Sequence, residues 1–314
     1  MPAIKCEKCS EKSVILLPFG PHYYCKTHFN EYFERKFKKT IRTNSLIKKN
    51  EKIGLAVSGG KDSITLLHLM HKFFGKIVDF HVIMIDEGIK NYRDKAIEKA
   101  VETCKKLKVP FTVIDLKKEL GFTMTDIMKK IKELDNNETS CSYCGVFRRK
   151  LLNDYARKLG CDKLATGHNM DDETQSITMN FFNNELEKLS RLGAITDSKE
   201  IKNLIPRIKP LYDCLEFEII AYSSLNNLIH FDGKCCPFSH KAKRNIFRSL
   251  LDETENKLPG TKHSIMKSFQ NLKPLLIKKY SKKNSLGYCN KCGEVSSGKT
   301  CMACKKLEKL KKVE

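Results

Sequence analysis

The sequence lacks any run of 18 uninterrupted apolar residues, so it offers no segment that could cross a membrane as a helix. It also lacks the apolar core of a secretory signal peptide, because Lys5, Glu7 and Lys8 come early in the chain. We therefore expect a cytoplasmic protein with no membrane partner. With 314 residues, 40% of them apolar, the chain can hold one sizeable α/β core and small appendages.

Acidic residues are scarce, with 37 Asp/Glu against 59 Lys/Arg and a formal net charge of +22. The first 50 residues hold 11 basic and 4 acidic residues, and residues 262–314 hold 14 and 3. Nearly all of the excess therefore lies at the two ends. A fold gains nothing from such self-repulsion, so a polyanionic partner is the natural reason, and nucleic acid is the first candidate. Ends that are merely solvated are the alternative.

Disulfides are not expected, because the 14 cysteines belong to a chain that we place in the cytosol. Ten of them fall into tight spacings, which favours metal binding. Three others, Cys104, Cys161 and Cys214, are isolated in apolar surroundings and are interpreted as buried core residues.

The N-terminal cysteines have the spacing of a zinc site. Cys6 and Cys9 are followed, after a 15-residue gap, by Cys25 and His28, which suits tetrahedral Cys₃His coordination. We expect residues 1–30 to form a zinc module that gains much of its folding energy from the metal. Residues 31–50 would be a basic linker helix, within a helical stretch that begins at Phe29. Its aromatic residues could pack on the core, or the stretch could contact RNA directly.

The C-terminal cysteines predict a second zinc site. Cys289, Cys292, Cys301 and Cys304 form two C-x-x-C pairs at close range, which is a strong signal for a zinc knuckle or ribbon. We expect a basic helix over residues 262–285 and the zinc module within residues 286–314. The Lys-rich tail beyond Cys304 is expected to be mobile.

The remaining residues, 51–261, are predicted to form the catalytic domain around a phosphate loop. An apolar strand from Ile53 to Val57 leads into Ser58-Gly59-Gly60-Lys61-Asp62-Ser63, and a helix continues to Phe74. Paired glycines let the backbone approach a ligand, and the helix N-terminus adds positive potential, so the loop suits an anion. The spacing differs from Walker A and resembles the PP-loop of N-type ATP pyrophosphatases. A glycine-rich turn without a ligand is the alternative.

Strands and helices alternate through this segment. Up to residue 210, further strands are predicted at Ile77–Ile85, Phe111–Asp115 and Lys163–Ala165 and helices at Tyr92–Leu107 and Phe147–Leu159, whereas the chain from Leu215 is predicted mostly helical, at Leu215–Asn227, His240–Glu255 and His263–Lys279. This alternation predicts an α/β fold, Rossmann-like, with a parallel sheet covered by helices on both faces. The loops Ser58–Ser63, Asp86–Gly88 and Gly167–Asp172 follow strand ends, so they should converge on one crevice.

Cys141 and Cys144 form a lone C-x-x-C pair, which is ambiguous between half a zinc knuckle, a redox pair and part of an iron–sulfur site. The next candidates are Cys235 and Cys236, about ninety residues further along. Three thiolates that meet at one point would suit a [4Fe–4S] cluster with one iron free of protein ligands.

The ordered set of these motifs resembles the tRNA 2-thiouridine synthetases of the TtuA/NcsA type, which are related to the eukaryotic wobble-uridine thiolase. The resemblance covers essentially the whole chain. It implies a PP-loop ATPase, flanked by two zinc modules, that adenylates the C2 oxygen of a tRNA uridine and lets sulfur displace AMP. The implied cofactors are ATP, Mg²⁺, a [4Fe–4S] cluster and two Zn²⁺.

The resemblance also assigns roles to residues. The ATP-binding set is Ser58, Gly59, Gly60, Lys61, Asp62, Ser63, Asp86, Gly167 and His168. Asp172 resembles the family's active-site carboxylate, as a base or an orienting group at the uracil. Arg148 stands where the family has a basic residue, and its permanent charge favours electrostatic support over proton transfer. Lys61 would offset phosphate charge together with Mg²⁺.

The implied cluster ligands are Cys141, Cys144 and Cys236. The family places the third ligand directly before proline, which selects Cys236, although Cys235 is an unusual neighbour. Hydrosulfide would bind at the open iron. The family implies a homodimer, a tRNA substrate and a sulfur donor that is either a ubiquitin-like thiocarboxylate carrier or free sulfide. The sequence does not distinguish these donors, nor an anticodon from a T-loop uridine.

Three rival interpretations stay open at this stage. A cluster-free enzyme would carry a persulfide on Cys144 or Cys236 and act by disulfide chemistry. A zinc-dependent RNA-binding protein would have an inactive PP-loop. Amidation or lysidine-type chemistry would share the loop but would leave the central and late cysteines without a use.

Overall fold

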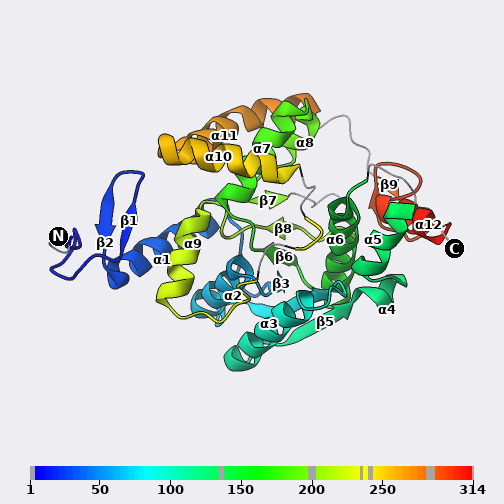
Figure 1. Ribbon diagram of the computed structural model, residues 1–314, viewed down its shortest axis with the longest axis horizontal. Coiled ribbons are helices and arrows are strands. Elements are labelled where there is room, and N and C mark those ends of the chain that lie inside the picture. Colours follow the sequence, from blue (N-terminus) through cyan, green and yellow to red (C-terminus); the bar gives the residue numbers. More distant parts are fainter. Residues whose placement is uncertain are drawn as a thin grey trace.

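The computed structural model describes residues 4–133, 138–196, 203–233, 236–239, 243–280 and 287–312. A six-stranded sheet covered by helices forms its centre, and the two termini lie at opposite ends of the longest axis (Figure 1). A small antiparallel hairpin stands toward each of these ends.

The strands of the described residues are β1 (Ile15–Leu17), β2 (His22–Tyr24), β3 (Lys52–Ala56), β4 (Asp79–Asp86), β5 (Phe111–Asp115), β6 (Lys163–Thr166), β7 (Ile195–Thr196), β8 (Arg207–Ile208), β9 (Gly287–Tyr288) and β10 (Val295–Ser296). The helices are α1 (Lys26–Thr43), α2 (Lys61–Phe74), α3 (Arg93–Leu107), α4 (Leu116–Leu120), α5 (Met124–Glu133), α6 (Ser140–Lys158), α7 (Met170–Phe182), α8 (Leu186–Ser190), α9 (Glu216–Leu225), α10 (Arg244–Lys257), α11 (Thr261–Tyr280) and α12 (Met302–Lys311). Within these ranges, each helix is too short or too polar to span a membrane.

The central sheet has the strand order β5-β4-β3-β6-β8-β7, and all neighbouring strands are parallel except β7 and β8. Side chains alternate between the two faces of the sheet along each strand, and helices bury both faces. On β4, Val82 and Met84 join one apolar cluster with α1, α2, α3 and α9, while Ile83 and Ile85 join another with α5, α6 and α12. The predicted α/β fold class is therefore confirmed.

The strand order places a switch point between β3 and β6. The chain moves from β3 outward to β4 and β5, and then returns to the other side of β3 as β6. Ligands of such sheets bind where the order reverses, outside the carboxyl ends of the strands. A Cβ on Gly167, just after β6, would come within 3.1 Å of the backbone of Asp62, so glycine lets this loop pass against the start of α2.

Helix α1 ties the N-terminal hairpin to the main core. Phe29, Phe33 and Phe37 lie one turn apart and are fully buried, and Phe33 stacks on Tyr222 of α9 with ring centroids 4.8 Å apart. Of the two interpretations left open for this stretch, packing of the aromatic residues on the core is therefore confirmed. The boundaries proposed at residues 30, 50, 261 and 285 stay predictions.

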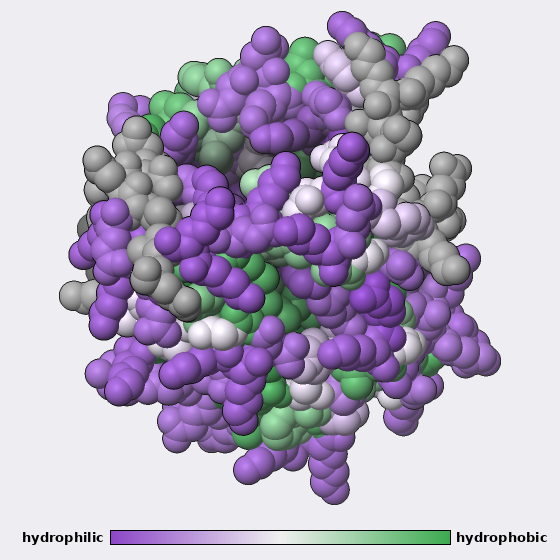
Figure 2. All heavy atoms as spheres, turned by 90° about the vertical axis from the view of Figure 1, so that its right-hand side faces the viewer, coloured by the Kyte–Doolittle hydropathy of each residue, from purple (hydrophilic) through white to green (hydrophobic). Residues whose placement is uncertain are grey.

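The C-terminal module packs against α6. Its helix α12 begins after Cys301, whose sulfur accepts a hydrogen bond from the Cys304 amide. Lys306 and Leu310 of this helix are buried, so the expectation of a mobile tail after Cys304 is wrong for the residues up to 312. Figure 2 shows the end of the molecule that carries the C-terminus, where hydrophilic side chains cover most of the face and apolar ones surface in small groups.

The predicted elements of the catalytic segment are present with shifted ends. The helix predicted from Phe147 begins seven residues earlier, at Ser140, so both central cysteines belong to its first two turns. The helix predicted from His240 is α10, which begins at Arg244, while His240 lies outside the described residues. Sequence reasoning did not predict α4, α5, α7 or α8.

Candidate active site and metal centres

The phosphate loop between β3 and α2 is held in shape by its own side chains. Ser63 Oγ accepts a hydrogen bond from the Ser58 amide at 3.1 Å and donates one to the Gly60 carbonyl at 2.9 Å. Gly59 has a φ of +84°, and a Cβ there would meet the Ala96 carbonyl oxygen at 2.0 Å, so only glycine fits. The loop therefore leads into the N-terminus of α2, an arrangement that binds anions.

Lys61 is engaged by two carboxylates at the start of α2. Its Nζ donates to Glu216 Oε1 at 2.6 Å and to Asp62 Oδ2 at 3.0 Å. Desolvation opposes the charge on Lys61, but these carboxylates outweigh it and raise the pKa of the ammonium. Lys61 thus stays protonated and offers its charge to any phosphate that displaces Glu216.

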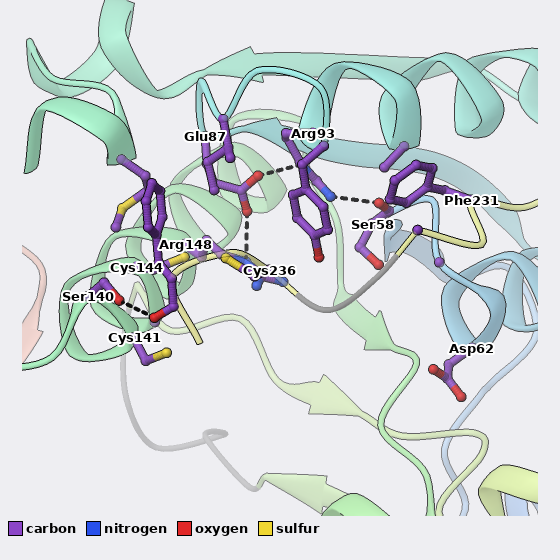
Figure 3. A pocket seen from close by; sticks show the side chains of 18 of the residues that line it. Ser58, Asp62, Glu87, Arg93, Ser140, Cys141, Cys144, Arg148, Phe231 and Cys236 are labelled. Carbon is purple, nitrogen blue, oxygen red and sulfur yellow. Dashed lines mark hydrogen bonds and ion pairs between the residues drawn. The ribbon is translucent and has the colours of Figure 1, made fainter. Parts of the chain in front are cut away.

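One cavity of about 570 Å³ connects the phosphate loop to the central cysteines. The predicted site residues that line it are Ser58, Gly60, Lys61 and Asp62 at one end and Cys141, Cys144, Arg148 and Cys236 at the other. In Figure 3, Cys144 and Cys236 lie beside Arg148, with Asp62 across the cavity. The structure thus brings groups from three separate segments into one cleft.

The thiol end is assembled from the start of α6 and the segment around Cys236. Ser140 Oγ donates to the Phe238 carbonyl at 2.8 Å and so ties these two segments together. Cys141 is exposed, whereas Cys144 and Cys236 are partly buried. Desolvation raises the pKa of Cys144 to about 11 and also raises that of Cys236.

These three thiols fit a cluster better than a single ion. Within the described ranges, only the two terminal groups of Cys and His side chains bring at least three ligand atoms within 4.8 Å of one another. A [4Fe–4S] cluster attaches its thiolates to separate irons, so they can stand further apart than the ligands of one zinc ion. Three thiols around one cavity meet that requirement. Cys235, the alternative third ligand, lies outside the described residues.

A row of charges connects the two ends of the cavity (Figure 3), in which Glu87 and Arg93 are buried and Arg148 is partly accessible. Glu87 is only 4% exposed and forms ion pairs with Arg93 and, at 3.4 Å, with Arg148 Nε. Arg93 also donates to the carbonyls of Ser58 and Ile85, each at 2.6 Å. Desolvation opposes the charge of Arg148, but Glu87 holds its pKa above the ordinary value.

Sequence reasoning did not identify Glu87 or Arg93 as site residues. The position of Glu87 directly after a buried strand is the one signal that points to it. Arg93 opens the next helix and gives no signal by residue type alone. Both were missed because the contacts that tie them to the site, from Arg93 to the Ser58 carbonyl and from Glu87 to Arg148, join segments that are distant in the sequence.

Asp172 lies beside the phosphate loop, at the start of α7. Its Oδ2 accepts from the Asn169 amide at 3.3 Å, and the Asn169 side chain accepts from the Asp172 amide at 3.0 Å. Asp172 Oδ1 accepts from Arg244 Nη1 at 3.3 Å, and Asn169 Nδ2 donates to Asp62 Oδ1 at 3.1 Å. The carboxylate is therefore fixed in orientation and linked to the phosphate loop, while 22% of its side chain stays accessible.

Two other predicted residues hold local structure near the loop. His168 is an exposed residue whose Nδ1 is hydrogen-bonded to Thr166 Oγ1 at 2.8 Å. Asp86 Oδ1 accepts from the Gly88 amide at 2.8 Å and fixes the turn after β4. Among the described residues, the predicted ATP-binding and catalytic residues that do not line the cavity wall are Gly59, Ser63, Asp86, Gly167, His168 and Asp172.

The N-terminal ligands are arranged as a metal site. Cys6 Sγ and Cys25 Sγ lie 3.4 and 3.3 Å from His28 Nδ1, and Cys9 Sγ lies 3.7 Å from Cys25 Sγ. Tetrahedral Zn–S and Zn–N bonds give edges of about 3.6–3.8 Å, close to these values. Against the cost of desolvation, backbone hydrogen bonds lower the pKa of Cys6 to about 6, which favours the thiolate that a metal needs.

The C-terminal ligands form a second such group. The sulfurs of Cys289, Cys292, Cys301 and Cys304 all lie within 4.8 Å of one another, with Cys292 and Cys301 separated by 3.6 Å. Desolvation is again outweighed by backbone hydrogen bonds, which lower the pKa of Cys289 to about 6. Both terminal groups therefore fit a tetrahedral metal ion of the zinc type.

Known proteins match this chain in sequence and in fold. A PP-loop domain matches residues 29–254. The tRNA 2-thiolation protein NcsA of Haloferax volcanii is 34% identical over 99% of this chain and 100% of its own length. The tRNA-5-methyluridine(54) 2-sulfurtransferase of Pyrococcus horikoshii is 33% identical over 96% of this chain and 93% of its own.

A solved structure extends the match to three dimensions. The U34-tRNA thiolase NcsA from Methanococcus maripaludis, with its [4Fe-4S] cluster, has a TM-score of 0.81 and 31% identity over 98% of this chain and 97% of that one. The fold and the loop thus define a PP-loop protein. Within that class, the chain belongs to the family of NcsA/TtuA-type tRNA 2-thiolation proteins.

Proposed function

We propose that this chain is an ATP-dependent tRNA 2-sulfurtransferase that converts a tRNA uridine to 2-thiouridine. The observation that carries the proposal is the single cavity that has the phosphate loop at one end and three cysteines at the other. A carbonyl oxygen is a poor leaving group, so it must become an AMP ester before sulfur can replace it. Both steps need the nucleotide and the sulfur source within reach of one uracil, and the shared cavity supports this arrangement.

The proposed reaction has two steps, adenylation of the uracil and displacement of AMP by sulfur. The uridine O2 attacks the α-phosphorus of ATP, an O–P bond forms, pyrophosphate leaves and the N3 proton is released. Hydrosulfide then attacks C2 and a C–S bond forms, while the C2–O2 bond breaks and O2 departs on AMP. The proton of the hydrosulfide ends on N3, which leaves 2-thiouridine, AMP and pyrophosphate.

The phosphate end would hold the nucleotide. The residues proposed to bind ATP are Ser58, Gly59, Gly60, Lys61, Asp62, Ser63, Asp86, Gly167 and His168. Lys61 and Mg²⁺ would offset the charge of the departing pyrophosphate. Asp172 would orient the uracil or accept its N3 proton, because its carboxylate is fixed in place next to the phosphate loop. Arg148, inside the cavity, would stabilise the negative charge of substrate or AMP.

Cys141, Cys144 and Cys236 would hold the [4Fe–4S] cluster. When bound by three cysteines, such a cluster has one iron open to a sulfur species. The two terminal metal groups would each hold Zn²⁺. The solved relative has a [4Fe-4S] cluster in its structure, which supports the same group here.

The partners follow from charge and from the family. The basic ends of the chain would bind the tRNA backbone. The target uridine differs between relatives, one of which is named for position 54 and another for U34. A homodimer, a cytoplasmic location and a sulfur donor, either a ubiquitin-like thiocarboxylate carrier or free sulfide, stay predictions.

The first test is the variant Asp172→Ala. We expect it to bind tRNA like the wild type but to form no 2-thiouridine, because the group that orients or deprotonates the uracil is gone. Thiolation would be followed by mass spectrometry of tRNA nucleosides mapped to position, with tRNA affinity as the control. Normal thiolation by this variant would show that Asp172 is not an active-site residue.

Anaerobic purification tests the thiol end. A brown protein with about four irons per chain is expected for a cluster held by three cysteines. A colourless protein that still thiolates tRNA would contradict the cluster and would indicate persulfide chemistry on the same thiols. ATP–pyrophosphate exchange, or AMP formation that depends on tRNA, would show that the protein is an enzyme and not an RNA-binding protein with an inactive loop.

A further inference from the structure

The C-terminal metal module reaches the thiol site through one buried lysine. Lys306 lies on α12, two residues after the ligand Cys304, and is only 4% exposed. A lysine is almost never buried without partners, because its ammonium loses its hydration. The partners of Lys306 therefore show what this module is attached to.

The described partners of the Lys306 ammonium all lie at or just before the start of α6. Nζ donates to Ser142 Oγ at 3.2 Å and stands 3.7 Å from the centroid of the Tyr143 ring. Glu138 Oε2 lies 3.6 Å away, and Lys309, less than one turn further along α12, donates to Glu138 Oε1 at 3.2 Å. Ser142 and Tyr143 are the two residues between Cys141 and Cys144, so the lysine holds the thiol motif itself.

Packing and hydrogen bonds reinforce this attachment. Tyr143 is fully buried, and its hydroxyl donates to Glu138 Oε2 at 2.6 Å. The Tyr143 ring belongs to the same apolar cluster as Ala303 and Leu310 of α12. The Ser140–Phe238 hydrogen bond then extends the support to the segment of Cys236. All three candidate iron ligands therefore depend on structure that α12 braces.

The helix that carries Lys306 depends on its metal group in turn. It has ten residues, and helices of that length are marginal on their own. Its N-cap is Cys301 and its first turn contains Cys304, so two of the four proposed ligands lie at its start. A metal there would fix the position of α12, and with it the position of Lys306.

We propose that the C-terminal metal module is a structural part of the thiol site, with Lys306 as the positioning residue that holds Cys141 and Cys144 ready for iron. This inference rests on the proposed function, because it takes those cysteines as iron ligands. The N-terminal module has a different place. It joins the core through α1, at the opposite end of the molecule (Figure 1), and serves as the natural control.

The test compares Lys306→Met with Lys305→Met in the full-length protein. Both changes remove one positive charge from α12, but Lys305 is exposed. We expect Lys306→Met to keep two zinc ions and to bind iron 10–100-fold more weakly, about the loss found when a supporting residue of a metal site is removed. In the zinc-loaded, iron-free protein, amides 138–147 should exchange hydrogen at least about ten-fold faster, as expected for a locally destabilised segment. Lys305→Met should match the wild type in both measurements.

Two further variants keep the test decisive. If Lys306→Met loses its C-terminal zinc, the variant Glu138→Gln becomes the test of the brace. It weakens the contact of Glu138 with Lys306 and leaves the sequence of α12 unchanged. Cys9→Ser should lose one zinc and keep its iron. Unchanged iron affinity and exchange in both Lys306→Met and Glu138→Gln would overturn the inference. A wild type that never binds iron would instead overturn the cluster assignment made in the proposed function, while the exchange of 138–147 would still test the brace.

Discussion

The two ends of the cavity are built in different ways. The phosphate end comes from one continuous stretch, Ser58–Ser63, which hydrogen-bonds to itself and leads straight into α2. The thiol end comes from the start of α6 and the segment of Cys236, braced from the side by α12. A local motif therefore makes one half of the site, and long-range packing makes the other.

This difference predicts how each end responds to damage. The phosphate end should lose its ligand without affecting the thiols, since the hydrogen bonds of Ser63 to Ser58 and Gly60 shape the loop from within. The thiol end should be sensitive to changes far along the chain. The ends are linked by the row of ion pairs through Glu87, which contacts Arg93 on the phosphate side and Arg148 on the thiol side. A second link is the hydrogen bond that the Phe231 amide donates to the Gly59 carbonyl at 2.9 Å.

The largest effect is expected from Cys144→Ala. Removing one of three iron ligands should abolish thiolation and iron binding, while ATP affinity, measured by calorimetry, should stay at the wild-type value. Cys161→Ala is the matched control, because Cys161 is a buried thiol of the same apolar cluster that does not line the cavity. Loss of ATP affinity in Cys144→Ala would show that the two ends are not independent.

A smaller effect, at the opposite end, is expected from Lys61→Met. The change removes the ammonium that would face the phosphates and should lower ATP-dependent turnover on the order of 10²-fold. Iron content should not change. Lys76→Met, at an exposed position just beyond the same helix, should leave turnover intact. A loss of iron in Lys61→Met would contradict the separation of the ends.

The same contrast explains what the sequence could and could not predict. The phosphate loop is one continuous run, and each terminal ligand set consists of two pairs with three-residue spacing, so these patterns could be found in the sequence. The early start of α6 and the burial of Lys306 were missed, because Lys306 reads as part of a solvated charge run until α12 is seen against α6. Glu87 was missed for the same reason, since its distant partner Arg148 lies on α6.

The smallest effect is expected from Glu87→Gln, which tests the link between the ends. The amide keeps the size of the side chain but leaves Arg93 and Arg148 without their shared counter-charge. Both ATP and iron should still bind, and thiolation should fall about 10–100-fold, as for residues that support a metal site from outside. Glu98→Gln, on the exposed side of α3, is the control. If only ATP affinity or only iron content fell, Glu87 would belong to one end, and the cavity would work as two sites rather than one.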